Sequence, residues 1–264
     1  MSTTNKNWTL GKLAALALTI ALFAATLASL ASSTPFGATV TYVSNTSKAA
    51  TNGTAVNYTG GGTSAGGYIF VTNLTGIQQN LRWKGFVGNI TGKFTLDDAS
   101  GNTLYDWSLV GAPSGTVLAT RTSGTVTWAN IKCAYLNVTD SEAFRMNHTN
   151  PSDNLTKTFP ASTNPQFTVG AVTLSANTCN TTKLYVNDSS PSGSVFFQSI
   201  LYDGGATLLT NDTSLLANVV YAALIEADVS GFDTKTYDFQ MILPENGLAS
   251  WTSSTAYYFY IELT

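Results

Sequence analysis

Hydrophobic and polar residues alternate along most of the chain after Pro35, a pattern that predicts short β-strands. The apolar positions are rich in β-branched and aromatic residues, and Gly, Asn, Asp and Pro separate the runs. We expect strands within these segments: Gly67–Leu74, Leu81–Ile90, Pro165–Leu174, Thr182–Asp188, Gly193–Gly204, Val219–Val229, Thr234–Pro244 and Thr255–Leu263. The run Val219–Val229 also fits a short helix, but its β-branched start favours a strand. A short helix is expected at Asn211–Asn218.

Two further segments have the pattern of β-hairpins. The first spans Gly92–Leu109 and turns at Asp98–Asn102, where Gly101 can adopt a positive φ. Its apolar residues occupy alternate positions along the two arms: Phe94, Leu96, Tyr105, Trp107 and Leu109. The second spans Gly115–Trp128 and is expected to turn at Ser123-Gly124.

A polar segment, Asp140–Pro165, interrupts the β pattern. It holds three prolines and has weak periodicity, so we expect a long loop or a peripheral insertion. A linker between two domains is the alternative, but Cys133 and Cys179 flank the segment, and a disulfide between them would join its ends. The predicted architecture is therefore one all-β domain, residues 33–264, with a β-sandwich or jelly-roll-like fold and an insertion around residues 140–165.

The first 32 residues have the pattern of an export segment. An uncharged apolar run, Leu13–Ala31, follows Lys6 and Lys12, and this charge bias favours a cytoplasmic N-terminus. Cleavage before Ser32 fits the small residues that end the run, whereas a run of this length could also remain as a helical membrane anchor. Processing near Gly11, as in prepilins, is a third alternative, which the following lysine disfavours. In each case the rest of the chain is expected outside the cell or on its surface.

Glycosylation motifs agree with export. The chain after Pro35 contains eleven sequons of the form Asn-x-Ser/Thr, more than the Ser and Thr content alone predicts. They begin at Asn45, Asn52, Asn57, Asn73, Asn89, Asn137, Asn147, Asn154, Asn180, Asn187 and Asn211. We expect a glycoprotein, with the compositional accident of a Thr-rich chain as the alternative.

Charge and composition narrow the class of protein. Only 10% of the residues are charged and the net charge is −3, so no basic stripe for nucleic acid is present in the sequence. Hydrophobic residues make up 44% and aromatic residues 11% of the chain, which argues against intrinsic disorder.

The sequence offers few groups for catalysis, and we expect no enzymatic activity. His148 is the only histidine, and its place within a sequon predicts an exposed loop position rather than a catalytic triad. A pair of carboxylates for glycoside hydrolysis would have to come from four glutamates. Glu226 could point inward, but no second acid pairs with it, and Glu262 is expected to face solvent.

No metal or cofactor site is expected either. The turn Asp97–Asn102 has several oxygen ligands, but it lacks the glycine spacing and distal glutamate of a calcium loop, so a structural calcium ion is only weakly supported. Four tryptophans alternate with polar residues in or near strands and are expected in the core, the alternative being an exposed platform for sugar rings: Trp83, Trp107, Trp128 and Trp251.

Several strings resemble archaeal secreted or cell-surface β-rich proteins, most of them uncharacterised. These are WKGFVGNITGKFTLDDASGNTLYDW (Trp83–Trp107), VTWANIKC (Val126–Cys133), GFDTKTYDFQMILPENG (Gly231–Gly247) and YYFYIEL (Tyr257–Leu263). The resemblance covers most of the chain from Gly66 onward. It implies an extracellular envelope protein and supplies no catalytic residues.

Three functions remain open on these grounds. A structural or interaction protein of the cell surface, which assembles into a filament or envelope layer, is the first. Its partners would be other surface proteins or copies of itself, and Thr39–Val43, followed by the glycine-rich Gly60–Gly67, could add as a strand to a neighbouring copy. The alternative for Thr39–Val43 is an ordinary first strand of its own sheet. An adhesin or carbohydrate-binding module is the second function, and an extracellular hydrolase is the least supported.

Overall fold

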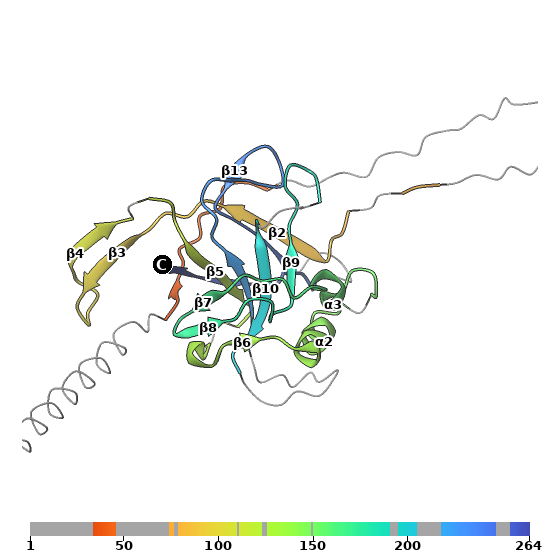
Figure 1. Cartoon of the computed structure of the whole chain (residues 1–264), viewed down its shortest axis with the longest axis horizontal. Coiled ribbons are helices and arrows are strands. Elements are labelled where there is room, and N and C mark those ends of the chain that lie inside the picture. The colour runs from red at the N-terminus through yellow and green to blue at the C-terminus, as the bar shows by residue number, and fades with distance from the viewer. Residues whose placement is uncertain are drawn as a thin grey trace, which may run out of the picture.

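Antiparallel strands are the commonest regular structure in the part of the chain that the structure describes (Figure 1). The computed structural model describes residues 34–45, 74–76, 79–109, 111–122, 126–148, 150–190, 195–204, 218–246 and 254–264. The all-β class predicted from the alternating pattern is confirmed. The apolar run 13–31, the glycine-rich segment 60–67, the helix expected at 211–217 and nearly all of the strand expected at 67–74 lie outside these residues. Among the described helices, none has the length and apolar character needed to cross a bilayer.

The largest sheet has seven strands. Its spatial order is β1 (Phe36–Gly37), β15 (Tyr258–Leu263), β5 (Gly115–Thr120), β11 (Val219–Leu224), β10 (Phe197–Tyr202) and β6 (Lys132–Cys133), with β9 (Thr181–Lys183) also paired to β10. Gly115 opens β5 with a φ of +127°, and a Cβ there would lie 1.9 Å from the carbonyl oxygen of Glu262. Glycine at this position therefore lets the backbone of β15 approach β5 closely.

The central strands of this sheet are buried on both faces. In β11, Val219, Tyr221 and Ala223 belong to one apolar cluster, while Val220 and Ala222 belong to the other. A strand covered on both sides has no solvent face, which explains why this segment is a continuous apolar run rather than an alternating one.

Different elements cover the two faces. The small sheet of β14 (Phe239–Pro244) and β2 (Trp83–Gly88) and the helices α2 (Leu136–Arg145) and α3 (Leu155–Thr158) contribute to the first cluster. The hairpin of β7 (Phe167–Val169) and β8 (Val172–Leu174) and the 3₁₀ turn η1 (Trp128–Asn130) lie against the second. Two further pairs, β3 (Lys93–Asp97) with β4 (Thr103–Ser108) and β12 (Val229–Ser230) with β13 (Thr236–Tyr237), stand apart from the main sheet.

The prediction of a loop over residues 140–165 is wrong. The segment forms most of α2 and all of α3, and its apolar side chains Leu155 and Phe159 are buried in the core. The helix α3 begins at Asn154, whose side chain accepts a hydrogen bond from the backbone N–H of Lys157 at 2.8 Å. Polar residues are frequent in the segment because only one side of each helix faces the sheet.

The hairpin predicted at Gly115–Trp128 is also wrong. Strand β5 is present, but its neighbours are β15 and β11, which are distant in sequence. Trp128 lies in the 3₁₀ turn instead of a second arm. The expected turn at residues 123–124 lies outside the described residues.

The predicted disulfide between Cys133 and Cys179 is confirmed. The bridge joins β6 to the segment before β9, across a sequence separation of 46 residues, and Cys179 is fully buried. It therefore fastens both ends of the helical segment to the same sheet edge, and the chain-entropy model assigns such a loop about 4 kcal/mol of stabilisation.

Candidate interaction surfaces

The β3–β4 hairpin projects from the body of the molecule (Figure 1). Its register places Phe94 opposite Trp107 and Leu96 opposite Tyr105, so these four side chains share one face. They are 46%, 50%, 50% and 59% exposed in the order Phe94, Leu96, Trp107 and Tyr105. We call these four residues the hairpin face. The hairpin predicted at Gly92–Leu109 is thus confirmed, but its apolar residues lie on a surface instead of in the core.

The opposite side of the hairpin is mostly polar, with Leu104, which is 81% exposed, as its one large apolar residue. Lys93 Nζ lies 2.5 Å from the Asp106 carboxylate, and Thr95 donates a hydrogen bond to Asp97 at 2.8 Å. The ribbon is therefore amphipathic, with an apolar side that is about half-exposed. Isolated two-stranded ribbons are marginally stable in water.

The turn of the hairpin is held by Asp98. Its carboxylate accepts hydrogen bonds from the backbone N–H of Ser100, the backbone N–H of Asn102 and the Asn102 side chain, each at 2.8 Å. These bonds, led by the one from the Asn102 side chain, lower the pKa of Asp98. The carboxylate oxygens of Asp98, which were considered as calcium ligands, thus accept the hydrogen bonds that close the turn. Among the described residues, no group of three or more His, Cys, Asp or Glu side chains is placed to hold a metal ion.

The segment after β1 leaves the sheet. Phe36 and Gly37 pair with β15, and the N–H of Ala38 donates to the carbonyl of Phe259 at 2.8 Å. No strand pairing follows over residues 39–45. Val40, Tyr42 and Val43 are 63%, 72% and 88% exposed. The alternative that Thr39–Val43 is an ordinary strand of its own sheet is therefore wrong. Only the two residues of β1, which precede this stretch, pair as a strand of the sheet.

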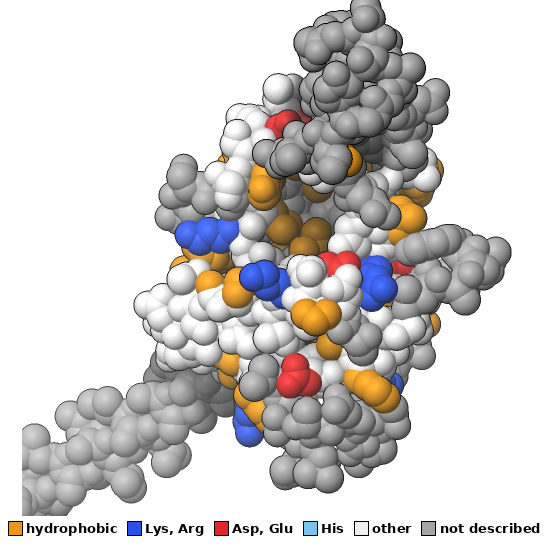
Figure 2. Space-filling view, turned by 90° about the vertical axis from the view of Figure 1, so that its right-hand side faces the viewer, with side chains coloured by type: hydrophobic (Ala, Val, Ile, Leu, Met, Phe, Trp, Pro, Cys, Tyr) orange, Lys and Arg blue, Asp and Glu red, His pale blue; other side chains and the backbone are white. Residues whose placement is uncertain are grey.

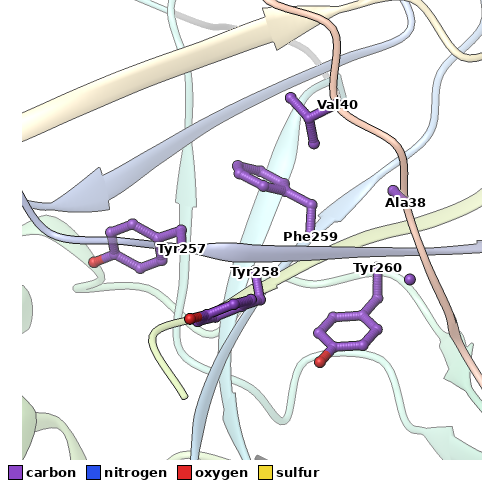
Figure 3. Close-up of a pocket in the computed structure, with 7 residues that line it drawn as sticks. Ala38, Val40, Tyr257, Tyr258, Phe259 and Tyr260 are labelled. Atoms are coloured by element: carbon purple, nitrogen blue, oxygen red, sulfur yellow. The ribbon is translucent and has the colours of Figure 1, made fainter. Parts of the chain in front are cut away.

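A shallow hollow marks the point of departure (Figure 3). It lies between Ala38, Val40 and residues 257–260, with a volume of about 310 Å³. Figure 3 shows the ring of Phe259 extending toward Val40, while Tyr258 and Tyr260 point to the other side of β15. Phe259 also packs edge-on against Phe86 of β2, with ring centroids 5.2 Å apart, so the hollow is open apolar surface at the margin of the core.

The tryptophans divide between core and surface. Trp83 packs against the first apolar cluster and donates its indole N–H to the carbonyl of Asp153 at 3.0 Å. Trp128 packs against the second cluster and against Tyr260, with ring centroids 5.0 Å apart. The prediction of a core position is wrong for Trp107, which lies half-exposed on the hairpin. Trp251 lies outside the described residues.

His148 is buried, which contradicts the expected exposed loop position. Its Nε2 lies 3.1 Å from the carbonyl oxygen of Glu245, and its ring meets Trp83 edge-on at 5.1 Å between centroids. Burial lowers the pKa of His148 and favours the neutral ring, whose Nε2–H donates to Glu245. No local pattern predicts this burial, because the residues that contact the ring, Trp83 and Glu245, are distant in sequence.

A buried ion pair that sequence reasoning missed lies beneath α2. Arg121 donates to both carboxylate oxygens of Glu142, at 2.8 and 2.6 Å, in a bidentate arrangement. Tyr221 donates to the same carboxylate at 3.4 Å. Burial alone would lower the pKa of Arg121, but the hydrogen bonds and charge of Glu142 outweigh it and raise that pKa. Arg121 and Glu142 lie 21 positions apart, so no short motif connects them.

The other glutamates also hold structure together. Glu226 accepts from the backbone N–H of Phe196 at 3.1 Å, and burial raises its pKa. Glu245 pairs with Lys84 and accepts from Thr255 at 2.7 Å. Glu262 was expected to face solvent, but it is 5% exposed and accepts from the backbone N–H of Gly170 at 2.8 Å.

The predicted sequons differ in accessibility. Exposed asparagines are Asn45, Asn89, Asn147 and Asn187, whereas Asn154 and Asn180 are half-buried. Asn137 lies in α2. Those outside the described residues are Asn52, Asn57, Asn73 and Asn211.

Charged side chains do not gather on the face that carries α2 and α3. Figure 2 shows basic, acidic and hydrophobic side chains interspersed there, with a recess in which hydrophobic side chains are visible. This face has no large field of a single sign, so it gives no basis for electrostatic recognition.

Comparison with known proteins found no matching family model, no matching curated protein and no matching solved structure.

Proposed function

We propose that this chain is a non-enzymatic, extracellular surface glycoprotein that assembles with copies of itself into a filament or envelope layer. In this proposal the apolar run 13–31 exports the chain, as a cleaved signal peptide or a retained helical anchor, and the rest is a β-sandwich or jelly-roll-like domain. The resemblance to archaeal surface proteins supports the compartment. The disulfide supports it too, because such bridges persist in oxidising environments.

The observation that carries the assembly is the exposed segment Thr39–Val43. It follows a two-residue strand and has no strand pairing of its own, and its apolar residues Val40 and Tyr42 occupy alternate positions, with Val43 next to Tyr42. A free segment of this kind pairs by β-augmentation: the backbone hydrogen bonds supply affinity and the alternate side chains set the register.

Association of the full-length chain in mild detergent tests the proposal. Sedimentation velocity and electron microscopy should reveal oligomers of the wild type. Val40→Asp with Tyr42→Asp should dissociate them at least tenfold more readily, while Thr39→Asp with Thr41→Asp, which adds the same charge at the polar positions, should have a much smaller effect. A wild-type chain that stays monomeric at every concentration would refute self-assembly.

A binding module is the second candidate, because Tyr105 and Trp107 present exposed rings 5.0 Å apart on the hairpin. Aromatic faces of this kind are frequent in ligand sites. A glycan array probed with the wild type and with Trp107→Ala tests this second function. A wild-type protein that stays monomeric and binds one class of glycan, with the binding lost in Trp107→Ala, would favour a binding module over assembly.

A further inference from the structure

The proposed self-assembly requires a surface that receives Thr39–Val43, and the hairpin is the described element that most lacks a partner. All residues of β3 and β4 are exposed, and the two strands pair only with each other. The outer edge of each arm therefore carries backbone N–H and C=O groups available to a further strand.

We infer that the β3–β4 hairpin of one copy receives residues Thr39–Val43 of a second copy as a third antiparallel or parallel strand. This inference rests on the proposed self-assembly and names its acceptor surface. A two-stranded ribbon with an apolar face is marginal alone, whereas three strands with such a face are stable. Pairing would thus stabilise the acceptor as well as the donor.

The side-chain patterns of donor and acceptor match. Val40 and Tyr42 stand two positions apart, as do Phe94 and Leu96 on β3 and Tyr105 and Trp107 on β4. Since alternate residues share a face, one register places both donor side chains beside the hairpin face. Thr39 and Thr41 of the donor, together with Val43, then fall on the mostly polar side of the ribbon, which also carries Leu104.

The donor and acceptor of one copy do not satisfy each other. The hairpin face is about half-exposed, and Val40, Tyr42 and Val43 are 63–88% exposed, although both elements belong to the same chain. Figure 1 shows the hairpin extending away from the body, whereas the segment after β1 stays beside the body. The second copy is therefore the occupant that the exposed surfaces favour.

The geometry of such a contact is head-to-tail. Donor and acceptor are different surfaces, so a pair of copies keeps one donor and one acceptor free for further neighbours. A heterologous contact of this type repeats into a ring or an open filament. A five-residue strand covers less than the ~800 Å² per partner of a standard interface, so a single contact of this kind is expected to be weak.

A matched pair of single substitutions tests the acceptor. Leu96→Lys places a charge on the hairpin face, and Thr95→Lys places the same charge on the adjacent polar side, between Asp97 and Asp106. Sedimentation velocity of the full-length chain should show association weakened at least tenfold by Leu96→Lys and within twofold of wild type for Thr95→Lys. An unchanged melting temperature in both would establish that the exposed hairpin, not the core, is affected.

Cysteine cross-linking supplies an independent readout. Full-length Thr41→Cys and Thr95→Cys chains, prepared separately and then mixed under mild oxidation, should form a disulfide-linked dimer, whereas Thr41→Cys mixed with Thr173→Cys on β8 should not. Equal cross-linking in both mixtures would overturn the inference. Oligomers that persist in Leu96→Lys but vanish in the variant with Val40→Asp and Tyr42→Asp would show that Thr39–Val43 is the donor strand and that its acceptor is another surface. A wild type that never associates would instead refute the proposed function itself.

Discussion

At the scale of single residues, burial decides the chemistry of His148. The ring is enclosed with Trp83 and next to the backbone of Glu245, with Arg82 and Asp153 as the nearest charged groups. Burial lowers its folded-state pKa below the ordinary value of 6.5, so the unfolded chain binds the proton more tightly. The stabilisation is therefore complete above about pH 6.5 and is lost as the pH falls toward the folded-state pKa.

This sign gives a direct prediction for His148→Gln, which cannot take up a proton. Between pH 7.5 and pH 5 the wild type should lose more of its unfolding free energy than the variant, because only the wild type gains a proton at this position on unfolding. Urea denaturation at both pH values measures the difference. Carboxylates titrate equally in the two proteins, so identical pH dependence would show that His148 is not held neutral.

The ion pair of Arg121 and Glu142 gives a second prediction at this scale. Glu142→Leu leaves the partly buried guanidinium without its carboxylate and should destabilise the fold by about 3 kcal/mol. Adding Arg121→Met removes the unpaired charge, and the double variant should recover most of the loss. Chemical denaturation of the two single variants and the double variant measures the coupling, and strictly additive losses would contradict a paired role.

At the scale of elements, the turn of the β3–β4 hairpin depends on one carboxylate. Asp98→Ala removes three hydrogen bonds that close the turn, while Asp97→Ala leaves them intact. Amide hydrogen exchange in β3 and β4 should accelerate roughly fivefold in Asp98→Ala, equivalent to about 1 kcal/mol. Exchange in β11 should not change, and a global acceleration would show that the hairpin is coupled to the core.

The strands and helices also show which parts of the fold can be predicted from the sequence and which cannot. Strands β2, β10, β11, β14 and β15 fall within predicted segments because their apolar patterns are local. The partners of β5 were missed, since pairing with β15 and β11 spans more than a hundred residues. The helices were missed because a short amphipathic helix with few apolar residues resembles a polar loop until the sheet that it covers is known.

The same reasoning applies to the candidate surfaces. Alternation correctly placed Phe94 with Leu96 on one arm of the hairpin and Tyr105 with Trp107 on the other, but a pattern reports only that a face is apolar. Whether that face meets its own core or another molecule depends on the path of the chain before and after the hairpin. Periodicity alone therefore cannot tell an apolar face in the core from one on the surface, and the structure supplies this distinction for the β3–β4 hairpin.

At the scale of the whole molecule, the accessibility of the sequons leads to the last prediction. An oligosaccharide transferred to asparagine needs an exposed side chain, so Asn45, Asn89, Asn147 and Asn187 should be occupied more fully than Asn154 and Asn180. At Asn154 the amide side chain also caps α3.

Peptide-level mass spectrometry of the native protein, from a sheared cell-surface fraction, measures this occupancy together with the mature N-terminus. A start near Ser32 with glycans at the exposed sites would establish a released surface glycoprotein, and an intact 13–31 would establish an anchored one. Unmodified sequons together with a cytoplasmic location would refute the proposed compartment, and with it the surface role of the assembly.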